Sequence, residues 1–130
     1  MKNLFIPYEQ ALVLKGLGFD ETSLANYGDS EDGIQMEIWN DENHYKWKTI
    51  CPAPTYQQVF KWFREKHNLW NMIYPRYDWN FNIQYIKDFD TIEDKGWGTD
   101  KESFHGSKFR TYEEAEFECL KKLIEIVKNK

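Results

Sequence analysis

Residues 54–70 read PTYQQVFKWFREKHNLW, and residues 110–130 read RTYEEAEFECLKKLIEIVKNK. In each stretch a threonine is followed three residues later by Gln58 or Glu114, which predicts a capping box at the start of a helix. Apolar residues then recur at helical spacing, with charged residues between them. The two stretches therefore predict amphipathic helices, and helix capping explains their similarity better than a functional repeat does.

The N-terminal half predicts one more helix and one β-hairpin. Residues 7–16 predict a short helix with Pro7 in its first turn and glycines at its end. Residues 20–33 are polar and turn-rich, which is typical of a surface loop, with room for a short strand near residues 25–27. Residues 34–39 and 44–50 alternate around the polar turn NDEN, and this predicts a hairpin.

The C-terminal half contains the clearest strand of the chain. Residues 79–85 alternate apolar and polar side chains, residues 70–74 predict their hairpin partner, and residues 103–110 predict a further strand. The order is α-β-β-α-β-β-(β)-α. It predicts a single α+β domain over residues 1–130, with an antiparallel four- to five-stranded sheet flanked by about three helices. The face that no helix covers is expected to carry either Trp39, Lys46 and Lys48 or the row Asn80, Asn82 and Gln84.

Charge and composition narrow the class of partner. The net charge of −5 argues against a nucleic-acid binder, because phosphate contacts need a surplus of Lys and Arg. No apolar run is long enough to span a membrane or to form a signal peptide, so a cytoplasmic protein is expected. The cysteines, Cys51 and Cys119, are too far apart in sequence for a CxxC motif. Cys119 falls in a helical apolar pattern and is expected to be buried.

The sequence assigns no catalytic residue, metal ligand or cofactor. The three histidines, His44, His67 and His105, have no helical spacing and no nearby cysteine, so they do not predict a zinc site. The acidic segment 87–103 lacks the ligand spacing of an EF-hand and reads as a solvated loop. Cys51, beside a proline at a strand end, could be an exposed nucleophile only if a histidine lay next to it. An enzyme is left open but is not favoured.

Aromatic residues are the one unusual feature of the composition, at 18% of the chain. That is more ring area than one small core easily encloses, and exposed Trp and Tyr side chains often mark binding surfaces. The alternative is a ring-rich core with partly covered edges, since Trp is rarely buried completely. The turn YPRYDW at residues 74–79 combines rings with an arginine. The candidate binding residues are Tyr74, Arg76, Tyr77, Trp79, Trp97 and Trp62.

Three blocks of the chain carry a resemblance. FIPYEQALVLKGLGFDE, APTYQQVFKWFREKHNL and TYEEAEFECLKKLIEIVK are similar to segments of small uncharacterised proteins of Bacteroidetes and of their phages and prophages. The resemblance implies a phage-related or mobile-element origin and a cytoplasmic setting. It carries over no catalytic, cofactor or binding residue.

Three functions follow as hypotheses. The leading one is a non-catalytic binding module that engages a protein through an aromatic and acidic surface. The alternative is a binder of a small molecule or nucleotide in an aromatic-lined pocket between sheet and helices. The third is an enzyme of unrecognised type. The oligomeric state is left open.

Overall fold

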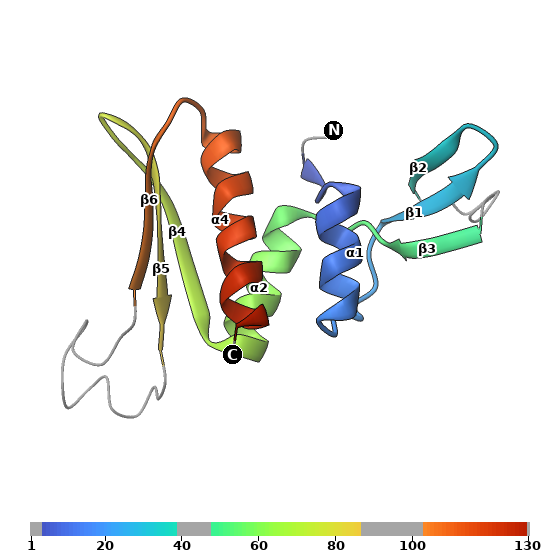
Figure 1. Ribbon diagram of the computed structural model, residues 1–130, viewed down its shortest axis with the longest axis horizontal. Coiled ribbons are helices and arrows are strands. Elements are labelled where there is room, and N and C mark those ends of the chain that lie inside the picture. Colours follow the sequence, from blue (N-terminus) through green and yellow to red (C-terminus); the bar gives the residue numbers. More distant parts are fainter. Residues whose placement is uncertain (1–3, 39–47, 87–102, 130) are drawn as a thin grey trace. The chain divides into compact units, whose positions relative to one another are not determined.

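The computed structural model describes residues 4–38, 48–86 and 103–129 (Figure 1). These residues form three helices and six strands, which confirms the α+β class. The predicted four- to five-stranded sheet is not confirmed, because the strands form two three-stranded sheets. The chain divides into two compact units, Met1–Val59 and Phe60–Lys130. The single-domain expectation stays a prediction.

The first unit begins with helix α1, Tyr8–Gly16, directly after Pro7, close to the predicted range. Its C-terminus is closed by two backbone bonds beyond the last turn: Phe19 N–H donates to Leu14 O at 3.0 Å, and Gly18 N–H donates to Lys15 O at 3.1 Å. Gly18 has a φ of 103°, as this Schellman closure requires. Of the two glycines predicted to end the helix, Gly18 closes it and Gly16 is its last residue.

The first sheet corrects the predicted hairpin. Its strands are β1 (Ala25–Ser30), β2 (Gly33–Ile38) and β3 (Lys48–Pro52), in the order β2-β1-β3. The described parts of the two alternating segments each pair antiparallel with β1, which lies between them. The predicted 40–43 turn lies outside the described residues.

Strand β1 lies within the predicted surface loop and extends the short strand expected near residues 25–27 as far as Ser30. Its sequence, ANYGDS, is poor in strand-forming residues, so composition alone indicates a loop. Tertiary contacts override that preference. Ala25 and Tyr27 are buried, the Tyr27 hydroxyl donates to Ile6 O, and the Tyr27 ring meets Tyr8 edge-on at 5.3 Å.

Helix α2, Tyr56–His67, starts as predicted at Thr55, whose Oγ1 accepts from Gln58 N–H at 3.2 Å. The other hydrogen bond of the capping box, from the backbone N–H of Thr55 to the Gln58 side chain, was wrongly predicted. Gln58 Nε2 instead donates to Thr22 O at 2.8 Å, which ties the segment before β1 to the start of α2. The predicted apolar stripe is buried, namely Tyr56, Val59, Phe60 and Phe63.

The second unit contains the predicted C-terminal hairpin. Strands β4 (Leu69–Arg76), β5 (Asp78–Tyr85) and β6 (Ser103–Phe109) form an antiparallel sheet in the order β4-β5-β6. Helix α4, Tyr112–Lys128, contacts all three strands and lies along one face of the sheet (Figure 1). Its side chains Ala115, Cys119, Leu120 and Leu123 are fully buried.

The start of α4 offers a local test of the capping argument. Thr111 Oγ1 accepts from Glu114 N–H at 3.1 Å, and Glu114 Oε2 accepts from Arg110 N–H at 3.3 Å. We expect Thr111→Ala to lower the free energy of unfolding by about 1 kcal/mol, because an N-cap hydroxyl is lost. Urea unfolding followed by circular dichroism measures the change. Thr111→Ser keeps the hydroxyl and should be nearly neutral, and equal losses in both variants would contradict the capping role.

Candidate binding surface on the second sheet

The side chains of β5 divide the sheet into a covered and an uncovered face. Phe81 and Ile83 are buried on the face that packs against α4. Asn71, paired with Ile83, hydrogen-bonds the α4 residue Cys119 and so lies on that same face. Because side chains alternate along a strand, the even-numbered β5 residues point the other way.

We call the other surface the open face, because α4, the helix that contacts all three strands, lies on the opposite side of the sheet (Figure 1). Its three strands contribute three rows of different chemistry. The β4 row is apolar to basic, the β5 row is mostly amide, and the β6 row is polar. Register places the following residues on the open face: Trp70, Met72, Tyr74, Arg76, Asp78, Asn80, Asn82, Gln84, Ser103 and His105.

Tyr77 occupies the tip of the β4–β5 hairpin. It is the only residue between the paired positions Arg76 and Asp78, its φ is 68°, and its side chain is fully exposed at 101%. A left-handed conformation is costly for a bulky residue. The Asn80 amide holds the turn, since its Nδ2 donates to Asp78 O at 2.8 Å and to Arg76 O at 3.2 Å. The ring gains no burial in return for this conformation.

The middle of the open face carries an unused acceptor. Asn82 Oδ1 is buried and accepts no hydrogen bond from the described residues. Its cross-strand neighbours are Met72, whose side chain is 55% exposed, and His105, also exposed. A buried acceptor without a donor is costly, but because this oxygen is buried it offers no contact point to a partner at the surface.

The end of the open face near α2 is basic and aromatic. The Arg64 guanidinium lies over the Trp70 ring, 5.7 Å from its centroid, and Trp70 is 38% exposed. At the tip end, Arg76 is exposed beside Tyr77. The open face therefore combines apolar area, amide groups and two arginines.

The six predicted site residues are only partly brought together. Tyr74 and Arg76 lie on the open face and Tyr77 at its tip. Trp79 lies instead on the covered face, half-buried, with its ring edge-on to Tyr112 at 5.5 Å. Trp62 is buried in α2, where its ring contacts Phe63 and His67. A binding role for either stays a prediction. Trp97 lies outside the described residues.

Sequence reasoning missed Met72, Asn82 and His105. The signal existed, because Asn82 belongs to the amide row expected on an uncovered face. Met72 and His105 could be added only once the strand register was known, since register pairs both of them with Asn82.

Neither cysteine is placed for nucleophilic chemistry. Cys51 was considered as an exposed nucleophile, and that was wrong, since it is 1% exposed. Burial raises the pKa of the Cys51 thiol, although Lys15 acts in the opposite direction. Burial raises the pKa of Cys119 to about 12, despite a lowering hydrogen bond from Asn71. Both groups are thiols, not thiolates, at neutral pH.

We expect no fast-reacting thiol in the folded protein at pH 8 and two after denaturation. A chromogenic disulfide reagent, with and without guanidinium, counts them. The raised pKa of Cys119 also makes the free energy of unfolding depend on pH. The contribution of its buried neutral thiol is complete below the ordinary pKa of 9.0 and is lost as the pH rises toward about 12. A rapid native reaction of either thiol would contradict this burial.

The described residues offer neither a metal site nor a membrane-spanning helix. They contain no group of three or more His, Cys, Asp or Glu side chains that could hold a metal ion. No helix among them is long and apolar enough to cross a membrane. The segment predicted as an acidic loop, 87–103, lies outside the described residues except for Ser103, which begins β6.

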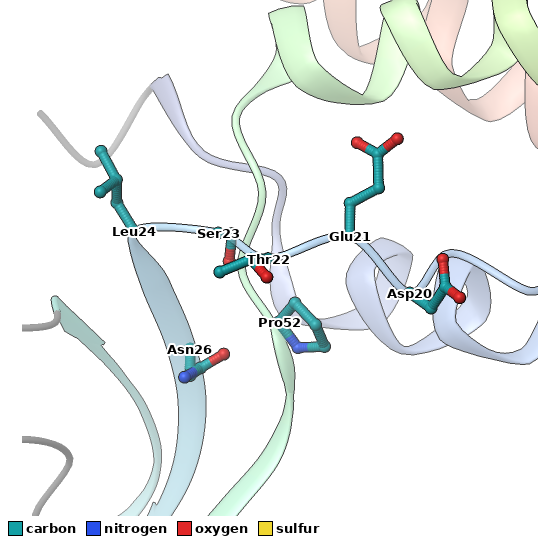
Figure 2. A pocket seen from close by; sticks show the side chains of 7 residues that line it. All are labelled: Asp20, Glu21, Thr22, Ser23, Leu24, Asn26 and Pro52. Atoms are coloured by element: carbon teal, nitrogen blue, oxygen red, sulfur yellow. The ribbon is translucent and has the colours of Figure 1, made fainter.

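A pocket of about 530 Å³ lies in the first unit (Figure 2). The segment before β1 supplies most of its wall, and Asn26 and Pro52 complete it. Asp20 and Glu21 bring two carboxylates, while the lining has no aromatic ring and no cation. This chemistry repels phosphate, so the pocket gives no support to a nucleotide site.

The described elements define an α+β protein with two three-stranded antiparallel sheets and three helices. No protein-family model, no curated protein and no solved structure matches the chain.

Proposed function

We propose that this chain is a non-catalytic binding module that engages another protein through the open face and the Tyr77 tip. The observation that carries the proposal is the fully exposed Tyr77 ring on a left-handed backbone. Strained residues persist where surrounding structure holds them, and they cluster at functional sites. Tyrosine is also among the residues that dominate binding energy at protein interfaces.

The chemistry of the open face favours a protein partner. Trp70 and Met72 offer apolar area, and the exposed Arg76 offers a charged fork. Apolar anchors with a polar surround are the usual anatomy of a protein interface. In the phage or mobile-element setting that the resemblance implies, the partner would be a host protein.

The alternative function, a binder of a small molecule or nucleotide, calls for an aromatic-lined pocket. The pocket beside Asp20 has the opposite chemistry, so the open face is the better-supported site. The alternative is kept as an outcome of the same experiment.

The experiment compares three proteins in a quantitative native pull-down from host-type lysate, read by mass spectrometry for proteins and small molecules. Tyr77→Gly removes the ring and relieves the left-handed strain, so it should unfold at slightly higher denaturant yet lose the partner. Leu24→Ala is the control, because Leu24 is 71% exposed but belongs to the first unit. It should keep the partner.

The partner is then purified and titrated against all three proteins. We expect saturable binding that Tyr77→Gly weakens at least about tenfold, which corresponds to about 1.4 kcal/mol. Equal affinities of wild type and Tyr77→Gly for the partner would show that the tip is not part of the interface. A co-purifying nucleotide or metabolite with no protein partner would sink the proposal in favour of the alternative.

A further inference from the structure

Each three-stranded sheet leaves two edge strands, and an edge strand can pair with another chain unless something prevents it. Among the described residues the edges are β2 and β3 in the first sheet and β4 and β6 in the second. Three of these four carry a recognisable protective feature. Strand β2 does not.

The edges of β3 and β6 are interrupted by bulges. On β3 the register shifts opposite Tyr27 and Gly28, which leaves Ile50 as the extra residue, and Lys15 Nζ donates to Ile50 O at 2.7 Å. On β6 the register shifts opposite Trp79 and Phe81, beside Lys108 with its φ of 68°. Bulges and lysines are features by which sheets avoid edge-to-edge pairing.

The edge of β4 contains Pro75, which has no N–H to donate to a new strand. Strand β2, by contrast, runs GIQMEI without proline, lysine or bulge, and all six of its residues pair in unbroken register with β1. Ile34 and Ile38 on this strand are 41% and 46% exposed. The edge is regular and partly apolar.

We infer that β2 is a self-association edge that pairs antiparallel with β2 of a second copy of this chain. The strand is nearly palindromic about Met36, with Ile34 and Ile38 two residues away and Gln35 and Glu37 one residue away. Pairing centred on Met36 sets each Ile34 opposite Ile38 of the other copy and each Gln35 opposite Glu37. The two sheets then form one continuous six-stranded sheet.

Side-chain chemistry selects this register. A register centred on Glu37 would set two carboxylates directly opposite each other, and a shift by one residue would oppose apolar to polar side chains. The Met36-centred register avoids both, pairs Ile34 with Ile38, which a register centred on Gln35 does not, and allows the Gln35 amide to donate to a carboxylate. A two-fold axis through Met36 makes the contact closed and self-complementary, so it ends at a dimer.

Charge predicts the salt dependence of this dimer. Residues 1–59 carry nine acidic and four basic side chains, a net charge of −5, so two copies repel each other. Salt screens that repulsion, and the dimer should tighten as ionic strength rises. If a basic strand from a different protein paired with the same edge instead, that complex should weaken as ionic strength rises.

The test is analytical ultracentrifugation of the full chain over a range of concentrations at low and high salt. Wild type should show a concentration-dependent monomer–dimer equilibrium that shifts toward dimer in high salt. Met36→Lys and Met36→Glu should each be monomeric, because each sets two like charges opposite one another. An equimolar mixture of the two variants should recover the dimer.

The matched control is Met72→Lys, the same substitution at an exposed methionine on edge strand β4 of the other sheet. It should dimerise like wild type. A wild type that stays monomeric in all conditions overturns the inference, as does a dimer that Met72→Lys abolishes or a mixture that fails to restore pairing. Circular dichroism of each variant separates lost pairing from lost folding.

Discussion

Leu120→Ala is expected to lower the free energy of unfolding of the second unit by about 2–5 kcal/mol. Leu120 is fully buried on α4, between the equally buried Cys119 and Leu123. This helix is the described element that contacts all three strands of the sheet, so its apolar face forms much of that core. Alanine would remove the buried methyl groups and leave a cavity that the packed neighbours fill only partly.

Urea unfolding, followed by circular dichroism and tryptophan fluorescence, measures the loss. The neighbouring control is Lys121→Ala. The Lys121 side chain is 46% exposed, and its ion pair with Glu118 spans 3.0 Å. Exposed pairs of this kind contribute about 0–1 kcal/mol, so the control should change little. A Leu120→Ala loss as small as the control's would show that α4 does not pack as described.

Gly106→Ala is expected to cost about 1–3 kcal/mol, although it adds a single carbon. A β-carbon at residue 106 would lie 2.8 Å from Phe81 Cδ1, 2.5 Å from its Cζ and closer still to its Cε1. The Phe81 ring cannot move aside easily, because it is buried and stacks on Phe109 with centroids 5.8 Å apart. Because Gly106 has no side chain, the Phe81 ring can occupy the space beside it on β6.

Two further variants separate this clash from a general effect of removing glycine. Gly16→Ala should be neutral or stabilising by up to about 1 kcal/mol, since nothing lies within 4 Å of a β-carbon there and the residue is helical. Phe81→Leu replaces the ring with a smaller side chain and so removes the clash. The double variant Phe81→Leu with Gly106→Ala should therefore lose less free energy of unfolding than the sum of the two single losses. Strict additivity would show that the clash is not the cause.

The helices were predictable because their signals are local. Thr55 and Thr111 cap the helices that follow, and a cap needs only backbone N–H groups within the next few residues. The reciprocal Gln58 bond was wrong for a non-local reason. Thr22 O, far away in sequence, offers that amide a partner at 2.8 Å.

The turn of the candidate site was predictable from the sequence, but the exposure of its aromatic side chains was less so. Pro75 and Asp78 around Tyr77 mark a turn by composition, so Arg76 and Tyr77 were found. Trp79 shares its alternation with the buried Phe81, which was a signal for the covered face. Ring content by itself does not tell which rings face water, since burial depends on what packs over each strand.

The sequence by itself determined three helices, their capped or glycine-closed ends, and the β4–β5 hairpin, because each depends on contacts within a few residues. Only the tertiary structure decided that β1 would lie between β2 and β3. It also decided that Trp62 would be buried and Trp79 half-buried, while Tyr77 is exposed. Strand partners and burial are set by contacts distant in sequence, and a polar strand such as β1 carries no local pattern that anticipates them.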